Sequence, residues 1–271
     1  MVNIKNKVVI ITGASSGIGE ATATYFGSKQ AKLVIAARSI DKLNALSTKM
    51  KASGIEVLAV KTDVSKEEEC KNLIDQTIGH FGQIDVLINN AGISMRALFI
   101  NLKLDVVRNV MGVNFWGTVY CTKFALPHLL KTQGTVAGIS SIAGYIGLPA
   151  RTAYSASKFA MHGFLEALRT ENLENNLHVL IACPGFTASN IRNSALKADG
   201  SSQGGSPRKE EEMMQPEEVA KELLTAIQKR KNKIILTREG RTAVLFKKLF
   251  PRIIRKLVFS KMKDEDDSPL K

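Results

Sequence analysis

A tyrosine and a lysine four residues apart, Tyr154 and Lys158, are the residues of this chain best suited to acid–base chemistry. On a helix they would lie on the same face, one turn apart. A free tyrosine has a pKa near about 10, and a neighbouring positive charge favours the phenolate. Tyr154 could then give a proton to a carbonyl oxygen or take one from an alcohol. This spacing is common by chance, so the prediction depends on residues elsewhere in the chain.

Two polar residues upstream support the acid–base interpretation. Ser141 lies 13 positions before Tyr154 and directly follows an apolar run, where its hydroxyl could polarise a substrate carbonyl. Ser140 is the alternative hydroxyl, and the 13-residue spacing favours Ser141. Asn114 lies within a helical pattern, and the alternative role for its amide is a hydrogen bond to the backbone. The predicted catalytic residues are Asn114, Ser141, Tyr154 and Lys158.

Three glycines near the start of the chain indicate a phosphate-binding turn. Gly13 permits a tight turn, Gly17 lets the backbone approach a pyrophosphate, and Gly19 lets the following helix pack closely on a sheet. The first N–H groups of that helix would then face the phosphates. Glycine spacing alone is a weak signal, but its position directly after the apolar run Val8–Ile11 favours a nucleotide.

The residues after the second predicted strand discriminate between two dinucleotides. An acidic side chain there would bind the ribose 2′-hydroxyl of NAD and repel a 2′-phosphate. This chain has Arg38 and Ser39 instead, a planar guanidinium and a hydroxyl that suit a phosphate. An ordinary solvated arginine is the alternative, and we predict NADP(H) as the cofactor.

Short apolar runs alternate with helical patterns along the chain, which indicates parallel βαβ units. Long helices over about 101–131 and 152–174 would carry Asn114 and the tyrosine–lysine pair, respectively. The predicted strands are Lys7–Ile11, Lys32–Ala37, Glu56–Lys61, Asp85–Asn89, Thr135–Ser140, His178–Cys183 and Lys233–Leu236.

Local signals predict helix boundaries and one long loop. A capping box at Ser65–Glu68 predicts a helix start, and Ser39 and Gly54 are predicted to begin and end the helix before it. The small, polar stretch Asp199–Pro207 falls in a predicted substrate loop of about 187–215, ahead of a helix near 216–229. Such an insertion is either a lid or a linker, and we favour the lid.

The net charge of +13 is concentrated in one segment. Between Lys229 and Lys263, 13 Lys and Arg residues stand against one acid, whereas the chain ends in an acidic tail. Apolar residues at helical spacing among these bases predict an amphipathic helix over 241–263, which Pro251 kinks or restarts. This helix favours a membrane surface, and packing on its own domain or on a partner subunit is the alternative. Nucleic-acid binding is disfavoured, because aromatic and small base-contacting residues do not accompany the charge.

The rest of the composition excludes several classes of protein. No apolar run is long enough to span a bilayer, and the N-terminal residues show no secretory signal. We therefore expect a cytoplasmic protein, peripheral at most to the inner, cytosolic face of a membrane. The three cysteines and four histidines lack disulfide or metal-ligand spacing, so no metal is expected.

The order of these features resembles the short-chain dehydrogenase/reductase family over residues 7 to about 236. The residues that carry the resemblance are Thr12–Gly19, Asn89–Gly92, Asn114, Ser141 and Tyr154–Lys158. The resemblance implies an α/β fold, a single Rossmann-type doubly wound domain whose seven-stranded parallel sheet is flanked by helices. Residues 1–240 would form this catalytic domain, and residues 241–271 the basic amphipathic helix and acidic tail.

The resemblance also implies individual roles. Asn114 would anchor a water that relays protons to Lys158, which would also bind the nicotinamide ribose. Asp63 and Val64 would hold the adenine ring. The loop after the sixth strand would close on the nicotinamide, with Ser189 where the family commonly has threonine. The predicted cofactor-binding residues are Gly13, Ser15, Ser16, Gly17, Ile18, Gly19, Arg38, Ser39, Asp63, Val64, Asn90, Ala91, Gly92, Tyr154, Lys158, Pro184, Gly185, Thr187 and Ser189.

The predicted activity is NADPH-dependent reduction of a hydrophobic, steroid-, retinoid- or sphingoid-like ketone, or the reverse oxidation of a secondary alcohol. The alternative is a non-catalytic NADP(H)-binding module that docks to a membrane or partner through its basic helix. The resemblance implies a homodimer or homotetramer formed through the two long helices. The apolar residues expected around the site, equally consistent with ordinary packing, are Ile142, Ile146, Leu148, Phe186, Met213 and Met214.

Overall fold

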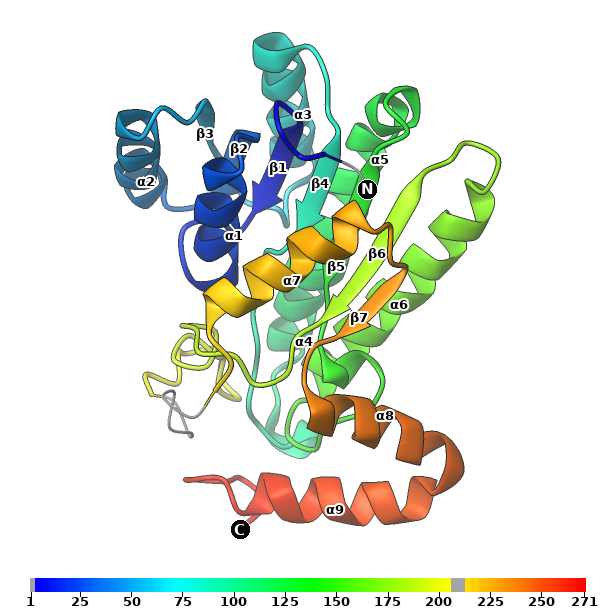
Figure 1. Ribbon diagram of the computed structural model, residues 1–271. Coiled ribbons are helices and arrows are strands. Elements are labelled where there is room, and N and C mark those ends of the chain that lie inside the picture. The colour runs from blue at the N-terminus through cyan, green and yellow to red at the C-terminus, as the bar shows by residue number, and fades with distance from the viewer. Residues whose placement is uncertain (1–2, 206–212) are drawn as a thin grey trace.

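The computed structural model describes residues 3–205 and 213–271. Its centre is a parallel seven-stranded sheet in the order β3-β2-β1-β4-β5-β6-β7 (Figure 1). Every predicted strand is present, with both ends within one residue of the prediction, which confirms the Rossmann-type α/β fold. The strands are β1 Val8–Thr12, β2 Lys32–Ala37, β3 Val57–Lys61, β4 Val86–Asn89, β5 Thr135–Ile139, β6 His178–Cys183 and β7 Lys233–Ile235.

Helices cover both faces of the sheet, which explains why the central strands are apolar throughout. In β1, Val9 and Ile11 pack in one layer with α1, α2 and α7, whereas Val8 and Ile10 pack in the other with α3, α5 and α6. The helices are α1 Gly17–Ser28, α2 Ile40–Ala52, α3 Glu67–Phe81, α4 Leu104–Met111, α5 Gly117–Lys131, α6 Thr152–Glu171, α7 Pro216–Gln228, α8 Arg238–Leu249 and α9 Pro251–Lys263.

Two local predictions were wrong in detail. The capping box at Ser65–Glu68 does not form, because the Ser65 hydroxyl donates to the Asp63 carboxylate at 2.7 Å and Glu69 accepts from the Asp63 N–H. These short-range bonds compete with the cap, and α3 begins at Glu67. The helix expected over 101–131 is also interrupted, since a π-helical turn at Gly112–Trp116 separates α4 from α5.

The predicted substrate loop is described up to residue 205 and from 213, and the stretch between lies outside the described residues. Leu196 forms a parallel bridge with Met95 after β4, and Thr187 forms another with Met214. These bridges tie the loop to the segment after β4 and to the start of α7. The helix expected near 216–229 is α7.

The C-terminal segment forms two helices, α8 and α9, that pack against each other and lie at the bottom of the view in Figure 1. Pro251 opens α9 after Phe250, so the proline restarts the helix as predicted. Ile254 and Met262 are buried, whereas Leu249, Ile253 and other apolar side chains of the pair are exposed. Among the described residues, no helix has the length and apolarity needed to cross a bilayer.

Candidate active site

A cavity of about 680 Å³ opens at the carboxyl ends of the strands. Its walls come from the loops after β1 to β6 and from the start of α6. β1 pairs with β2 on one side and β4 on the other, so the strand order reverses here. Open parallel sheets bind their ligands at such a switch point, and the volume is in the range typical of ligand pockets.

Close backbone contacts shape the phosphate-binding turn. Gly13 has φ of +67° and Gly17 of +56°, both in the left-handed region that favours glycine. A Cβ on Gly13 would lie 2.8 Å from the Ala91 Cα, and one on Gly19 only 2.2 Å from the Gly13 carbonyl oxygen. Gly19 therefore packs α1 against the turn and does not line the cavity. The α1 N-terminus begins at Gly17 on the cavity wall, so the residues present fit a bound pyrophosphate.

Asn90 joins the ends of β1 and β4. Its Nδ2 donates to the carbonyl oxygens of Thr12 at 2.9 Å and Gly13 at 3.2 Å. In return, the Thr12 hydroxyl accepts from the backbone N–H groups of Asn90 and Ala91. This pair of reciprocal contacts fixes the spacing between the phosphate-binding turn and the segment that follows β4.

Three polar side chains meet the cavity at the end of β2. Arg38 and Ser39 line it as the sequence led us to expect, and so does Lys42, which the sequence analysis missed. Ser39 occupies the N-cap position of α2, although its side chain makes no capping bond. Two cationic side chains therefore line the cavity beside the N-terminus of α2, a combination that favours anionic groups. A lysine in the first turn of the helix after Arg38 was the signal available in the sequence.

The two adjacent serines after β5 point to different partners. Both serines line the cavity, but the Ser140 hydroxyl lies 2.7 Å from His162 Nε2, whereas the Ser141 hydroxyl accepts from the Ala143 N–H at 3.2 Å. Burial raises the pKa of Tyr154, while the polar hydroxyl of Ser141 and the positive charge of Arg151 lower it in part. Of the two serines, Ser141 is the one whose hydroxyl acts on the pKa of Tyr154.

Lys158 is buried below Tyr154, and its Nζ lies 5.8 Å from the centroid of the tyrosine ring. Its Nζ donates to the carbonyl oxygen of Ile139 at 2.8 Å, and burial lowers the pKa of this ammonium to about 8. Arg151 was absent from the predicted site. Of the charged groups nearby, it has the largest effect on the pKa of Tyr154, which it lowers.

Asn114 lies in the π-helical turn between α4 and α5 and is fully buried. Its Oδ1 accepts from the Ile93 N–H at 2.8 Å, and its Nδ2 donates to the Ile93 carbonyl and to the Ser157 hydroxyl. The amide therefore bonds to the backbone of another segment, not to that of its own helix. Asn114 does not line the cavity, and it connects the loop after β4 to α6.

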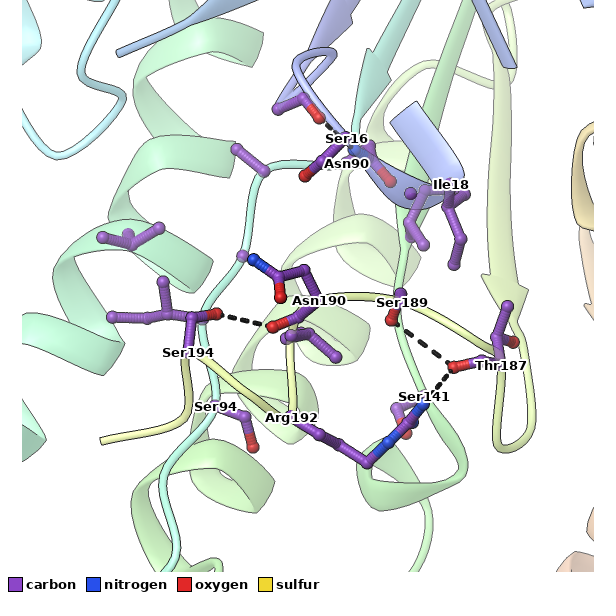
Figure 2. Close-up of a pocket in the computed structure, with 18 of the residues that line it drawn as sticks. Ser16, Ile18, Asn90, Ser94, Ser141, Thr187, Ser189, Asn190, Arg192 and Ser194 are labelled. Atoms are coloured by element: carbon purple, nitrogen blue, oxygen red, sulfur yellow. Dashed lines mark hydrogen bonds between the residues drawn. The ribbon is translucent and has the colours of Figure 1, made fainter. Parts of the chain in front are cut away.

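The loop after β6 lines the cavity and comes close to the phosphate-binding turn. Ser189 lies beside Gly17, where a Cβ on the glycine would be 3.2 Å from the Ser189 Cβ. Figure 2 shows the guanidinium group of Arg192 turned back to Thr187, whose carbonyl oxygen it contacts at 2.8 Å. The remaining predicted cavity residues, all of which line it, are Ser15, Ser16, Ile18, Asp63, Val64, Ala91, Gly92, Pro184 and Gly185.

The apolar residues that line the cavity differ from those that the sequence suggested. Of the six apolar residues expected there, only Leu148 and Phe186 line it. Ile142 instead meets Gly240 of α8, so packing explains its apolar character. The polar lining residues that sequence reasoning missed are Ser94, Arg151, Asn190, Arg192 and Ser194. Within the described residues, no cluster of side chains suits a metal ion.

Comparison with known proteins places this site in a family. Residues 7–200 match the profile of the family described as short chain dehydrogenase. The chain is similar to 11-beta-hydroxysteroid dehydrogenase-like 2 of Arabidopsis thaliana, with 42% identity over 72% of this chain and 64% of that protein, so it spans just under two thirds of that relative. It is 35% identical to dehydrogenase/reductase SDR family member 7B of Bos taurus, over 98% of this chain and 84% of the relative.

Solved structures give the same assignment. A short-chain dehydrogenase/reductase from Burkholderia phymatum in complex with NAD superposes with a TM-score of 0.83 and 25% identity, covering 93% of this chain and 96% of that one. An alcohol dehydrogenase from Thermococcus sibiricus complexed with 5-hydroxy-NADP gives 0.76 and 26%, covering 85% and 95% of the two chains. The chain belongs to the short-chain dehydrogenase family.

Proposed function

We propose that the protein reduces the carbonyl group of a hydrophobic ketone with NADPH, or oxidises the corresponding secondary alcohol with NADP⁺. The observation that carries the proposal is the meeting of Ser141, Tyr154 and Lys158 in one cavity with the turn at Gly13–Gly17. The bound nicotinamide would supply or accept the hydride. Tyr154 would hold the proton that the substrate oxygen gains or loses, and Ser141 would orient that oxygen.

The proposed roles of the buried groups follow from their contacts. Lys158, held by the Ile139 carbonyl, would bind the ribose next to the nicotinamide and favour the phenolate of Tyr154 when charged. Asn114 would keep the Ile93 segment and α6 in register beneath this pair, and it would anchor the proton-relay water. The non-catalytic alternative gives no reason for Ser141, Tyr154 and Lys158 to line one cavity together.

NADP(H) is proposed over NAD(H) because Arg38 and Lys42, which follow β2, line the adenosine end of the cavity. No acidic residue of the segment between β2 and β3 lines the cavity. The test is a fluorescence titration of the purified protein with NADPH and NADH, repeated with Arg38→Ala, Lys42→Ala and the double variant. Selective loss of NADPH affinity in the variants supports the proposal. Equal affinities for both cofactors in the wild type would overturn it.

A lipid-like substrate is proposed from two observations. One relative of this chain carries the name of a hydroxysteroid dehydrogenase, and Leu148 and Phe186 provide apolar contacts in the cavity wall. Turnover of ketosteroids, retinals and long-chain ketones with NADPH tests this substrate class, with the loss of nicotinamide absorbance as the readout. Turnover restricted to small polar ketones would contradict it.

We propose that the α8–α9 pair contacts an anionic membrane surface from the cytoplasm. Its exposed apolar side chains stand among lysines and arginines, the composition that binds anionic interfaces. Sedimentation with phosphatidylserine vesicles, compared with phosphatidylcholine vesicles, tests this contact. The exposed apolar residues of α8 and α9 are Leu245, Phe246, Leu249, Phe250, Ile253, Leu257 and Phe259.

A homodimer or homotetramer is proposed through the long helices that carry the site. Leu104 of α4 and Trp116 at the start of α5 are large apolar side chains that remain exposed, as does Phe159 of α6. Burial of such side chains between subunits would stabilise an assembly. Light scattering of wild type and Trp116→Glu tests this: a smaller assembly in the variant supports the proposal.

A further inference from the structure

One acidic residue of the C-terminal tail is buried against the active-site wall. Glu265 follows α9 by two positions, and its side chain is only 2% exposed. The neighbouring carboxylates of Asp264, Asp266 and Asp267 are exposed, as acidic tail residues ordinarily are. A buried carboxylate is costly unless it is paired, so its partners show why the tail lies here.

Two buried arginines from distant parts of the chain hold Glu265. Arg151 Nη2 lies 3.0 Å from Glu265 Oε2 and 3.4 Å from Oε1, and Arg96 Nη2 lies 3.4 Å from Oε2. The arginine side chains are 8% and 6% exposed, respectively. One carboxylate therefore connects the loop after β4, the start of α6 and the C-terminal tail.

Arg151 carries this connection into the active site. It is the N-cap residue of α6, three residues before Tyr154, and its positive charge acts on the pKa of Tyr154. Arg151 also lines the cavity. The charged and polar groups that act on Tyr154 from the surrounding elements are Ser141, Arg151, Cys183 and Arg192, and Lys158 lies below its ring.

We infer that Glu265 is a positioning residue for the reaction, because it holds Arg151 on the substrate side of the cavity and balances its charge beside Tyr154. The C-terminal tail thereby completes the active site. The inference rests on the proposed function for its catalytic meaning. The geometry of the three paired side chains is independent of the substrate.

The charges give opposite signs for two substitutions. Glu265→Gln leaves the guanidinium of Arg151 unbalanced, so the added positive charge favours the phenolate of Tyr154. Arg151→Met removes that positive charge, while Glu265 keeps Arg96 as its counter-ion. We expect the pH profile of alcohol oxidation with NADP⁺ to move to lower pH in the first variant and to higher pH in the second, each by about half a unit to one unit. Asp267→Asn is the matched control, since it removes an exposed charge from the same tail and should leave the pH profile of oxidation unchanged.

A second measurement needs no substrate. In protein labelled with ¹³C at tyrosine Cζ, the resonance of Tyr154 is assigned by its loss in Tyr154→Phe. The chemical shift of this resonance changes as the phenol loses its proton, and this change should begin at lower pH in Glu265→Gln than in wild type. In Arg151→Met, the change should begin at a pH no lower than in wild type.

The outcomes separate the two proposals. Shifts of opposite sign in Glu265→Gln and Arg151→Met support the inference, and a merely structural clamp would lower stability in both without moving either profile. Coincident profiles, or shifts in the same direction, overturn it. If Glu265→Gln does not fold, as NADPH titration and thermal unfolding would show, Arg151→Met alone decides by the sign of its shift. A wild type that turns over no ketone or alcohol refutes the proposed function, and the tyrosine resonance still decides the inference.

Discussion

The ammonium group of Lys158 donates to the carbonyl oxygen of Ile139, the last residue of β5, at 2.8 Å. This bond crosses from α6 to the central sheet and fixes the lysine below the Tyr154 ring. Lys158 is only 3% exposed, so its charge is stabilised by few groups other than this carbonyl. The position that suits the chemistry is thus unfavourable for the charged form of the side chain.

Stability should therefore rise with pH across the titration of Lys158. Burial lowers its pKa from 10.5 to about 8 in the folded protein. Between these values the unfolded chain binds more protons than the folded chain, so the free energy of unfolding increases with pH. The full gain is up to about 3 kcal/mol. Urea unfolding at about pH 7.5 and about pH 10 should show this gain in the free energy of unfolding of wild type relative to that of Lys158→Met. A difference between the two proteins that stays constant with pH would contradict this.

Removing one hydroxyl should separate catalysis from cofactor binding. Tyr154→Phe eliminates the group that gives the proton but keeps the ring over Lys158. We expect kcat to fall by about 10²- to 10⁴-fold while NADPH affinity stays within a factor of two or so. Steady-state kinetics and nicotinamide fluorescence on one preparation measure both. Unchanged turnover in the variant would show that Tyr154 does not supply the proton, and NADPH binding without any turnover in wild type would favour the non-catalytic alternative.

The adjacent serines provide a matched pair of variants. Ser141→Ala removes the hydroxyl that would orient the substrate oxygen and that lowers the pKa of Tyr154, and we expect kcat to fall by at least about 10²-fold. Ser140→Ala removes the bond to His162, which burial keeps neutral by lowering its pKa to about 4. That change should lower thermal stability, and it should reduce kcat less than Ser141→Ala does. A larger loss of kcat in Ser140→Ala would assign the substrate hydroxyl to the other serine.

The strands and the phosphate-binding turn could be predicted because local sequence determines them. Strands such as His178–Cys183 are buried on both faces, which leaves a continuous apolar run. Glycines at Gly13 and Gly17 are required by backbone angles that other residues rarely adopt. Pro251 marks the break between α8 and α9, because proline is tolerated in the first turn of a helix and not in its interior.

The features that were missed depend on contacts between distant segments. Glu265 meets Arg151 across 114 positions, and no local pattern distinguishes it from the exposed acids beside it. The interruption at Gly112–Trp116 arises where Asn114 bonds to Ile93, a tertiary contact that overrides helical periodicity. Ile142 was expected near the substrate because of its sequence position, and packing against α8 accounts for it instead.

Gly19 tests how tightly the phosphate-binding turn is built. A Cβ at this position would lie 2.2 Å from the Gly13 carbonyl oxygen and 2.6 Å from Asn90 Nδ2, so Gly19→Ala must displace backbone. We expect it to lower the free energy of unfolding by about 1–3 kcal/mol and to weaken NADPH binding, since the same turn would cradle the pyrophosphate. Gly79→Ala in α3 is the matched control, because its Cβ would meet nothing within 4 Å. The control should raise stability by about 0.5–1 kcal/mol, since alanine is the better helix former. Urea unfolding and NADPH titration of both variants measure the contrast. If Gly19→Ala bound NADPH as tightly as wild type does, the turn would be more flexible than its contacts indicate.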